Sequence, residues 1–298
     1  MTTVALKKGS EMTLKQRKKE NCPLLLCFFS ILLLAFFISM IAFYRKVRKA
    51  TGMSEIIEKD GKLHNLDHLS FESICPITSI SSLSPEERQP VADDERYMMT
   101  PPKGGKLHLL CCDTTKGQFN LLLHQNWAPV GVPHFLEMVE AGYFTTSRIP
   151  LFRCTDACQF GLAGDVNMTK RFSRRIKDDP QWLPPGPDHR ENAKGVRRYP
   201  TGYFTHAGAG ENSRSNQFVI TLKPNRFMGG GSPWEVPMGE LVGEHSFQTI
   251  SRWYNGYGEK GPSQKLLKEE GVTKKVLTGW PMMDYIYRCR VTDEHDLG

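Results

Sequence analysis

The pattern of hydrophobic and polar residues separates an apolar N-terminal run from a body of short mixed segments. From Asn21 to Tyr44 no side chain is charged, and residues 23–44 are mostly Leu, Ile, Phe and Ala. As a helix this run would extend about 33 Å, enough to cross the hydrocarbon core of a bilayer. Because no convincing small-residue cleavage site follows it, we predict an uncleaved transmembrane signal anchor at 23–44 rather than a signal peptide or a buried core helix.

The pattern changes again near residue 104. A basic tail at 1–22 precedes the anchor, and residues 45–103 have only scattered apolar positions, so we interpret them as a stem. From 104 to 298 short apolar runs are cut by Gly and Pro, which predicts an antiparallel sheet or barrel. The predicted strands are 107–112, 117–123, 202–205, 217–222, 238–242 and 285–291.

Two segments of this body have apolar residues at three- and four-residue spacing, which is typical of a helix packed on a core. The first runs from Val132 to Val139, with Gly142 placed to end it. The second runs from Phe247 to Tyr254 and ends before Gly256. The sequence therefore predicts a mainly β domain with two helices.

Charge and composition narrow the choice of partner. The formal net charge is +7, but the first 50 residues hold ten Lys and Arg against two Glu, so the remaining 248 hold 29 basic and 30 acidic residues. Binding along a nucleic-acid backbone needs a basic protein surface. We therefore expect no nucleic-acid partner for the folded body.

The compartment is predicted from three features. Basic residues flank both ends of the anchor, so charge alone leaves its orientation nearly tied. The sequence 167–169 is an Asn-x-Thr glycosylation pattern at Asn167, and six of the eight cysteines follow the anchor. We predict a single-pass type II glycoprotein of the endoplasmic reticulum or Golgi, with its C-terminal domain in the lumen.

Several common catalytic sites are excluded by their missing motifs. The chain has no His-Glu-x-x-His zinc helix and no Gly-x-Ser-x-Gly nucleophile turn. Gly208-Ala-Gly210 is followed by a predicted strand, whereas a phosphate loop needs a helix N-terminus. Cys154 and Cys158 lack a second pair at ligand spacing, so a structural role is favoured over a metal or redox site.

A series of short motifs follows one order along residues 106–291. These are 116–123, Trp127-Ala-Pro129, Phe135-Leu136, Leu151-Phe-Arg153, Gln159-Phe-Gly161, Gly164-Asp165, Ala207-Gly-Ala-Gly210, 217–221, 238–242, Asn255-Gly-Tyr-Gly258 and Gly261-Pro-Ser-Gln264. Together they resemble the cyclophilin-type peptidyl-prolyl cis-trans isomerase family. Residues 176–180 and 281–285 suggest a branch with a longer loop and tail.

The resemblance implies a closed eight-stranded antiparallel barrel capped by two helices, with an active groove on its outer face. It also implies isomerisation of X-Pro bonds in protein segments, without a cofactor or metal. Rotation about such a bond meets a barrier of roughly 18–20 kcal/mol, which a hydrogen-bond donor near the prolyl nitrogen can lower. The implied catalytic residues are Arg153 as that donor, with Gln159 and Gln217. The implied substrate-binding residues are Phe152, Gly208, Ala209, Val219, Phe227 and Met228.

Three departures from the family pattern bear on activity. Only Cys-Thr-Asp-Ala-Cys lies between Arg153 and Gln159, about two residues fewer than usual, so part of the proline pocket is missing or comes from elsewhere. Phe227 stands where the family usually has tryptophan, which predicts weak cyclosporin binding. The usual groove histidine aligns with Trp234 or Glu235, and the sequence does not decide between them.

These observations leave three functions to compare. The first is a membrane-anchored prolyl isomerase of the secretory lumen, supported by Arg153 and Gln217. The second is a catalytically weak module that binds proline-containing partners, supported by the shortened segment after Arg153. The third, a Golgi glycosyltransferase with the same anchor-and-stem plan, is disfavoured because no Asp-x-Asp metal motif is present.

One disulfide is implied by the resemblance. In the family the last strand lies next to the first, so Cys289 is expected beside Cys111 and Cys112. We predict a bridge between Cys289 and one of these two residues, against the alternative of three free buried thiols.

Overall fold

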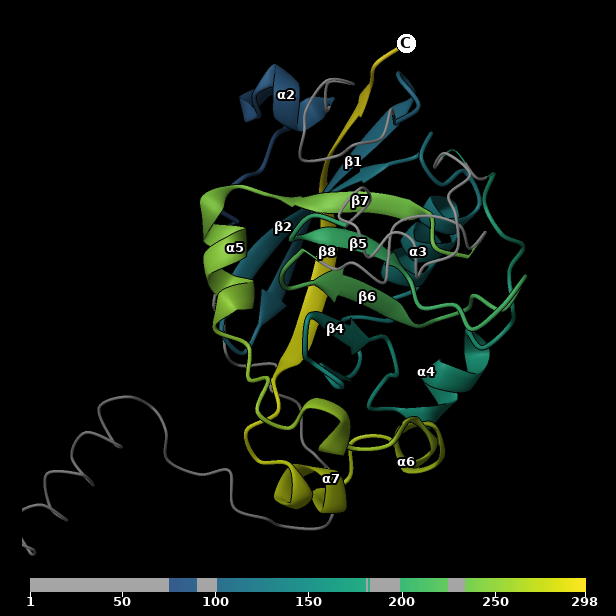
Figure 1. Cartoon of the computed structure of the whole chain (residues 1–298), viewed down its shortest axis with the longest axis vertical. Helices are drawn as coiled ribbons and strands as arrows, with labels where there is room; N and C mark the ends of the chain where they lie inside the picture. The colour runs from purple at the N-terminus through teal and green to yellow at the C-terminus, as the bar shows by residue number, and fades with distance from the viewer. Residues whose placement is uncertain (1–74, 90–100, 181, 183–198, 225–233) are drawn as a thin grey trace, which may run out of the picture. The chain divides into compact units, whose positions relative to one another are not determined.

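An eight-stranded antiparallel sheet organises the part of the chain that the computed structural model describes, which is residues 75–89, 101–180, 182, 199–224 and 234–298. The strand order is β3-β8-β1-β2-β7-β5-β6-β4. The two outer strands meet because Phe152, just after β3, bridges to Gln159 in β4. The sheet is thus a nearly closed barrel (Figure 1), and the prediction of a mainly β fold is confirmed. The strands are β1 (Lys106–Thr114), β2 (Gly117–His124), β3 (Ile149–Pro150), β4 (Ala157–Phe160), β5 (Tyr203–His206), β6 (Phe218–Thr221), β7 (Pro237–Val242) and β8 (Tyr285–Asp296).

The two predicted helices are α3 (Gly131–Glu140) and α5 (Glu244–Ser251). Each contributes apolar residues to the main core, among them Phe135 from α3 and Ile250 from α5. The helix α3 ends at Ala141, and Gly142 follows with a φ of +73°, which glycine adopts without a steric penalty. Shorter elements complete the chain: η1 (Ile80–Ser82), α2 (Pro85–Arg88), α4 (Val166–Arg171), η3 (Gly258–Lys260), α6 (Gln264–Glu270) and α7 (Lys274–Gly279).

The barrel interior is filled by aromatic side chains, so it is a packed core and not a channel. The rings of Phe135, Phe204 and Phe218 contact one another, with centroids 4.9 to 5.5 Å apart. Such edge-on and stacked pairs add stability beyond the area they bury. The ligand-binding surface must therefore lie outside the barrel.

The N-terminus of α3 receives its cap from a distant loop. Val130 at the N-cap makes no side-chain capping bond. Instead the Asp179 carboxylate accepts hydrogen bonds from the backbone nitrogens of Val130 and Gly131, the latter at 3.0 Å. A Cβ on Gly131 would lie 2.9 Å from the same carboxylate, so only glycine permits this approach. The loop at 176–180 is therefore part of the folded unit.

Residues 75–89 pack on the outside of the barrel. A disulfide joins Cys75 to Cys111 in β1, and Ile80 and Leu83 are buried in a second apolar cluster on β1, β2 and β7. The Asp293 carboxylate accepts a hydrogen bond from the Ile80 nitrogen at 2.7 Å. These residues lie in the expected stem, so the compact unit, which spans Phe71–Gly298, starts before the expected boundary at 104.

The predicted bridge to Cys289 is present. Cys112 and Cys289 are cross-strand partners in β1 and β8, and they form a disulfide. This bond joins the first strand of the barrel to the last, as the resemblance implied.

Within the ranges that the structure describes, no helix combines the length and the apolar character that membrane crossing requires. The predicted anchor at 23–44 lies outside these ranges, so it stays a prediction.

Candidate active site

Two glutamine side chains come together on the outer face of the barrel. Along β4 and β6 the side chains alternate: Phe160 and Ile220 enter the core, whereas Gln159 and Val219 face outward and are half-buried. Gln159 and Val219 are cross-strand partners. The Gln159 Nε2 donates a hydrogen bond to Gln217 Oε1 at 2.9 Å. Three of the residues implied by the resemblance therefore lie on one surface.

The loop before β6 borders this surface. The Ala207 nitrogen donates to the Gln217 carbonyl at 2.9 Å, and the Ala209 nitrogen donates to Ser213 Oγ at 2.8 Å. A Cβ on Gly208 would lie 2.6 Å from the Cβ of Trp234, so glycine lets Trp234 pack against the loop. Gly208 and Ala209 thus stand beside Gln217, as the resemblance implied.

Arg153 is oriented differently from the strand residue that we expected. It follows β3 with a φ of +52°, in the left-handed region that non-glycine residues seldom adopt. The Cys154–Cys158 disulfide closes the tight hairpin that follows. Because the segment is short, the chain reverses directly after Phe152, and Phe152, not Arg153, pairs with Gln159.

The guanidinium of Arg153 makes an ion pair with an acidic residue from a distant loop. Its Nε lies 2.7 Å from Glu259 Oε2, and the two side chains are 43% and 63% exposed. Glu259 belongs to η3, between Tyr257 and Gly261. Sequence reasoning missed Glu259 because it stands in a polar, Gly-rich loop with no periodic or motif signal.

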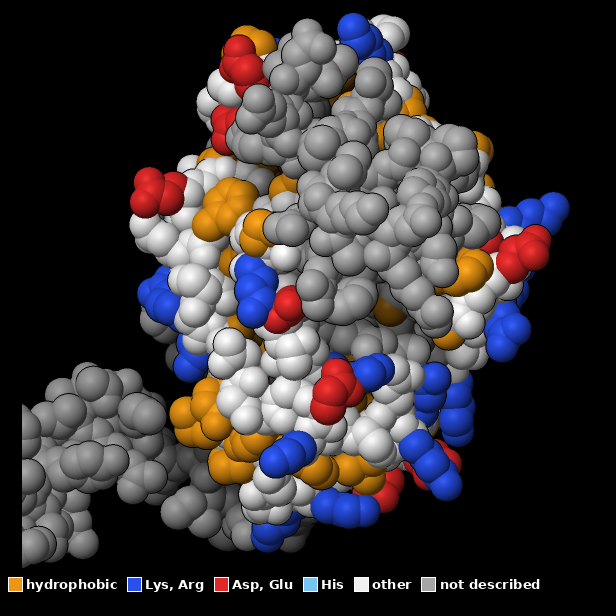
Figure 2. All heavy atoms as spheres, in the orientation of Figure 1, with side chains coloured by type: hydrophobic (Ala, Val, Ile, Leu, Met, Phe, Trp, Pro, Cys, Tyr) orange, Lys and Arg blue, Asp and Glu red, His pale blue; other side chains and the backbone are white. Residues whose placement is uncertain are grey.

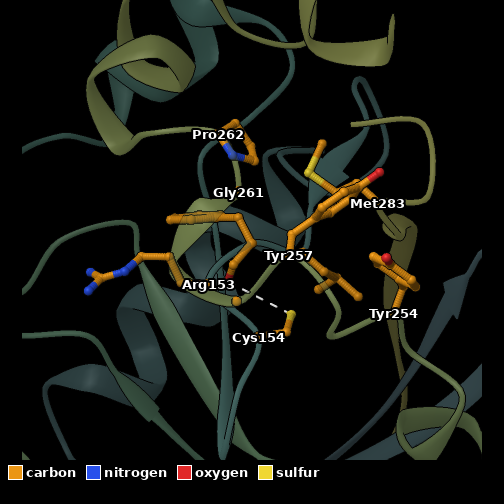
Figure 3. Close-up of a pocket in the computed structure, with 10 residues that line it drawn as sticks. Arg153, Cys154, Tyr254, Tyr257, Gly261, Pro262 and Met283 are labelled. Atoms are coloured by element: carbon orange, nitrogen blue, oxygen red, sulfur yellow. Dashed lines mark hydrogen bonds between the residues drawn. The ribbon is translucent and has the colours of Figure 1, made fainter. Parts of the chain in front are cut away.

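A shallow pocket lies on the other side of the Arg153 backbone. Figure 3 shows that the Arg153 side chain points away from Tyr254, Tyr257 and Met283. Phe152, which the resemblance implies as a substrate-binding residue, is only 2% exposed and packs in an apolar cluster with Met283. Its side chain therefore belongs to the packed interior beside this pocket. The pocket is lined by Leu151, Phe152, Arg153, Cys154, Tyr254, Tyr257, Gly258, Gly261, Pro262 and Met283.

Three further residues of the predicted sites are Phe227, Met228 and Asn167. Phe227 and Met228 lie outside the described residues, so their roles stay predictions. Asn167 is exposed on α4, while the hydroxyl of Thr169 is buried and accepts a hydrogen bond from the Ala163 nitrogen at 2.9 Å.

Two histidine rings lie close together behind the loop before β6. His206 in β5 is paired across strands with Phe218, and its ring stacks near that of His134 at 5.9 Å. Burial is the main cause that lowers the pKa of His206 well below its usual value, and the charge of Arg214 lowers it further. Burial also lowers the pKa of His134. Both imidazoles are therefore neutral near pH 7.

In the described ranges no group of three or more His, Cys, Asp or Glu side chains is arranged to hold a metal ion. Among the described residues, the side-chain Oε1 of Gln159 and the side-chain Nε2 of Gln217 make no hydrogen bond, so the pair offers one acceptor and one donor side by side.

Comparison with known proteins identifies the family. A family model described as cyclophilin type peptidyl-prolyl cis-trans isomerase/CLD matches residues 110–272, more than half of the chain. A search of curated proteins gives no match.

Solved structures of cyclophilins align with much of the chain at low similarity. A cyclophilin-type isomerase of Cryptosporidium parvum is 17% identical, with 62% of this chain and 97% of that chain covered and a TM-score of 0.38. The same protein in the presence of the dipeptide Ala-Pro is 16% identical, with coverage of 61% and 98% and a TM-score of 0.38. The cyclophilin AquaCyp293 of Hirschia baltica is 11% identical, with coverage of 61% and 73% and a TM-score of 0.39. On the match of the family model, this chain belongs to the cyclophilin-type peptidyl-prolyl cis-trans isomerase family.

Proposed function

We propose that this protein is a peptidyl-prolyl cis-trans isomerase that acts on X-Pro bonds of protein substrates in the secretory lumen. The observation that carries the proposal is the Gln159–Gln217 pair on the outer face of a cyclophilin-type barrel. Its unengaged donor and acceptor match the C=O and N–H groups of one extended peptide unit. Val219, half-exposed beside Gln159, offers apolar contact to a proline ring.

The reaction needs stabilisation of a twisted amide and no covalent intermediate. As the C–N bond rotates, the lone pair of the prolyl nitrogen leaves conjugation and becomes a hydrogen-bond acceptor. A donor fixed at that nitrogen binds the twisted state more strongly than the planar one and so lowers the barrier. Arg153 is the candidate donor, because its charged guanidinium carries five N–H groups in a planar fork.

The ion pair with Glu259 does not prevent this role. It engages Nε of Arg153 on an exposed surface, where such pairs contribute only about 0–1 kcal/mol. A substrate that offers an acceptor to the guanidinium can therefore compete with Glu259. Turnover then depends on how readily the arginine turns toward the Gln159–Gln217 pair.

A second candidate function is a binding module with little catalysis. The left-handed backbone of Arg153 and its ion pair with Glu259 favour it, because both hold the guanidinium in an orientation that the family pattern did not predict. In that case the glutamine pair binds a proline-containing segment, but the protein does not accelerate isomerisation of the X-Pro bond.

The secretory location is proposed from three features of the chain. The described part contains three disulfides, which persist in oxidising compartments. Asn167 is exposed for glycosylation, and residues 23–44 have the length and composition of an anchor. Extraction of the protein by alkaline carbonate would contradict the membrane anchor. Digestion of the domain by protease added to intact microsomes would contradict its luminal position. The lack of an endoglycosidase-sensitive mass shift would contradict glycosylation at Asn167.

The catalytic proposal is tested with the full-length protein and a proline peptide whose isomerisation is followed by protease coupling. We expect Arg153→Ala to lower the rate by about 10²–10³-fold, as for other single donors to a transition state. Lysine at this position should rescue poorly, because one ammonium cannot reproduce the planar fork. Lys275→Ala, which removes a similar exposed ion pair with Glu270, is the matched control.

Glu259→Gln separates the two candidates. If Glu259 only restrains an active arginine, this variant raises the rate. If the wild type and both variants show no acceleration but bind the peptide, the protein is a binding module. Equal rates for wild type and Arg153→Ala would remove Arg153 from the mechanism.

A further inference from the structure

A dense group of basic side chains occupies the surface of α4 and the segment after it. Lys170, Arg171, Arg174, Arg175 and Lys177 are all exposed, and no acidic residue lies among them in 170–177. Figure 2 shows Lys and Arg side chains gathered around the position that α4 has in Figure 1. Since the chain after residue 50 is nearly neutral, this group is a local concentration of charge, which we call the basic surface.

The carboxylates that follow the basic surface in the sequence pair with an arginine behind it. Asp178 and Asp179 directly follow Lys177, but both turn toward buried Arg214, at 3.2 Å from its Nε and 2.6 Å from its Nη1. Asp178 also accepts a hydrogen bond from the Asn212 nitrogen at 2.8 Å. Within the part of the chain that the structure describes, none of the five basic residues forms an ion pair. Only solvent ions or an anionic partner can therefore reduce the repulsion between these like charges.

The segments that carry the basic surface are hydrogen-bonded to the loop that carries Gln217. The Asn216 side chain donates a hydrogen bond to the Thr169 carbonyl at 2.9 Å, and Asn216 directly precedes Gln217. On the other side, the Ile176 nitrogen donates to the Arg214 carbonyl at 2.9 Å. Thus α4 and the strand-like segment at 176 are tied to the same loop that carries Gln217.

We infer that the basic surface selects proline-containing segments that carry anionic groups beside the proline. An extended peptide advances about 3.3 Å per residue, so a segment held at the Gln159–Gln217 pair can continue past the loop that carries Gln217 toward α4. Exposed opposite charges also attract the segment before it docks. The inference rests on the proposed function, because it uses the glutamine pair as the anchor point for proline. A peptide is favoured over a membrane surface because the segments that carry the basic residues are tied to the loop that carries Gln217.

The test compares peptides of equal length with a proline flanked by neutral residues, by Asp and Glu, or by phosphoserine. Isomerisation and direct binding by calorimetry are both measured with the full-length protein. We expect roughly ten-fold lower KM and Kd for acidic than for neutral peptides at low salt, with the advantage lost at about 0.5 M salt. A preference for phosphoserine alone would assign the anionic group to phosphate esters rather than carboxylates.

Charge reversal locates the effect. Arg174→Glu/Arg175→Glu should bring the acidic-to-neutral ratio close to one. The unfolding curve of this variant shows whether it folds. If it folds poorly, Lys170→Glu/Lys177→Glu takes its place and should also bring the acidic-to-neutral ratio close to one. A control variant is Lys274→Glu/Lys275→Glu on α7, which makes the same change in net charge on a different helix, removes the Lys275–Glu270 ion pair and should keep the ratio.

Failure of the inference and failure of the proposed function give different results. If no peptide is isomerised but acidic peptides bind better and lose this advantage in Arg174→Glu/Arg175→Glu, the substrate preference stands and the isomerase proposal fails. If wild type isomerises all peptides equally, the inference is wrong and the isomerase proposal stands. Binding to phosphatidylserine vesicles without any preference for acidic peptides would also overturn the inference, because the basic surface would then contact membranes.

Discussion

Two regions of the barrel are closed by disulfides, and they differ in what the bond does. At the junction of β1 and β8, Cys112–Cys289 joins residues 177 positions apart between regular strands. At the Arg153 hairpin, Cys154–Cys158 spans four positions and closes a turn in which Arg153 has a positive φ. The first bond holds the barrel together, whereas the second shapes one local segment beside the groove.

The difference shows where this chain keeps the family pattern and where it departs from it. The strand junction follows the pattern, since the resemblance alone predicted that Cys289 lies beside Cys111 and Cys112. The hairpin departs from it: the shortened segment makes Phe152 the partner of Gln159 and directs Arg153 toward Glu259. We therefore expect stability to depend most on the strand junction and the proposed activity to depend most on the hairpin.

The largest effect is expected at the strand junction. Replacing Cys112 and Cys289 together by Ser should lower the free energy of unfolding by about 5 kcal/mol, because the closed loop restricts the unfolded chain strongly. Urea unfolding of the oxidised proteins measures it. A loss no larger than that of the hairpin double variant would contradict this comparison.

A smaller loss is expected at the hairpin. Replacing Cys154 and Cys158 together by Ser should lower the free energy of unfolding by about 2 kcal/mol, because a loop of four positions restricts the unfolded chain little. The same urea experiment measures it, with Cys112 and Cys289 intact. A change in isomerisation rate at unchanged fold would show that the bond also sets the orientation of Arg153.

The smallest effect is a pH dependence of stability. Burial lowers the pKa of His206, His134 and His245 in the folded protein. The unfolded chain therefore binds more protons below about pH 6.5, so stability is full above that pH and falls as the pH drops through it. Unfolding curves at several pH values should show this slope, and His206→Asn should reduce it. A stability that stays constant from about pH 7 to 5 would contradict the account.

Much of the fold could be predicted from the sequence because its elements carry local periodic signals. Apolar runs bounded by Gly or Pro marked β1, β2 and β5 to β8, and three- and four-residue spacing marked α3 and α5. Residues 75–89 were assigned to the stem because scattered apolar positions such as Ile80 and Leu83 form no periodic pattern. Their burial depends on a surface built by three distant strands.

The candidate site was predictable in composition but not in arrangement. Gln159 and Val219 lie on strands whose alternation fixes which side chains face outward, and Gln217 directly precedes one of these strands. The Arg153–Glu259 pair joins residues 106 positions apart through two irregular loops. The capping of α3 by Asp179 likewise joins two loops. Such contacts depend on loop conformations that leave no periodic trace in the sequence.

The proposed mechanism requires that Arg153 reach a substrate held by the Gln159–Gln217 pair and donate a hydrogen bond to its twisted amide. Exchange NMR of a proline peptide with full-length protein tests this most directly, because it reports binding and cis-trans exchange in one experiment. The account predicts exchange cross-peaks with wild type, and their loss with Arg153→Ala while line broadening from binding persists. Cross-peaks of equal intensity with both proteins would contradict it.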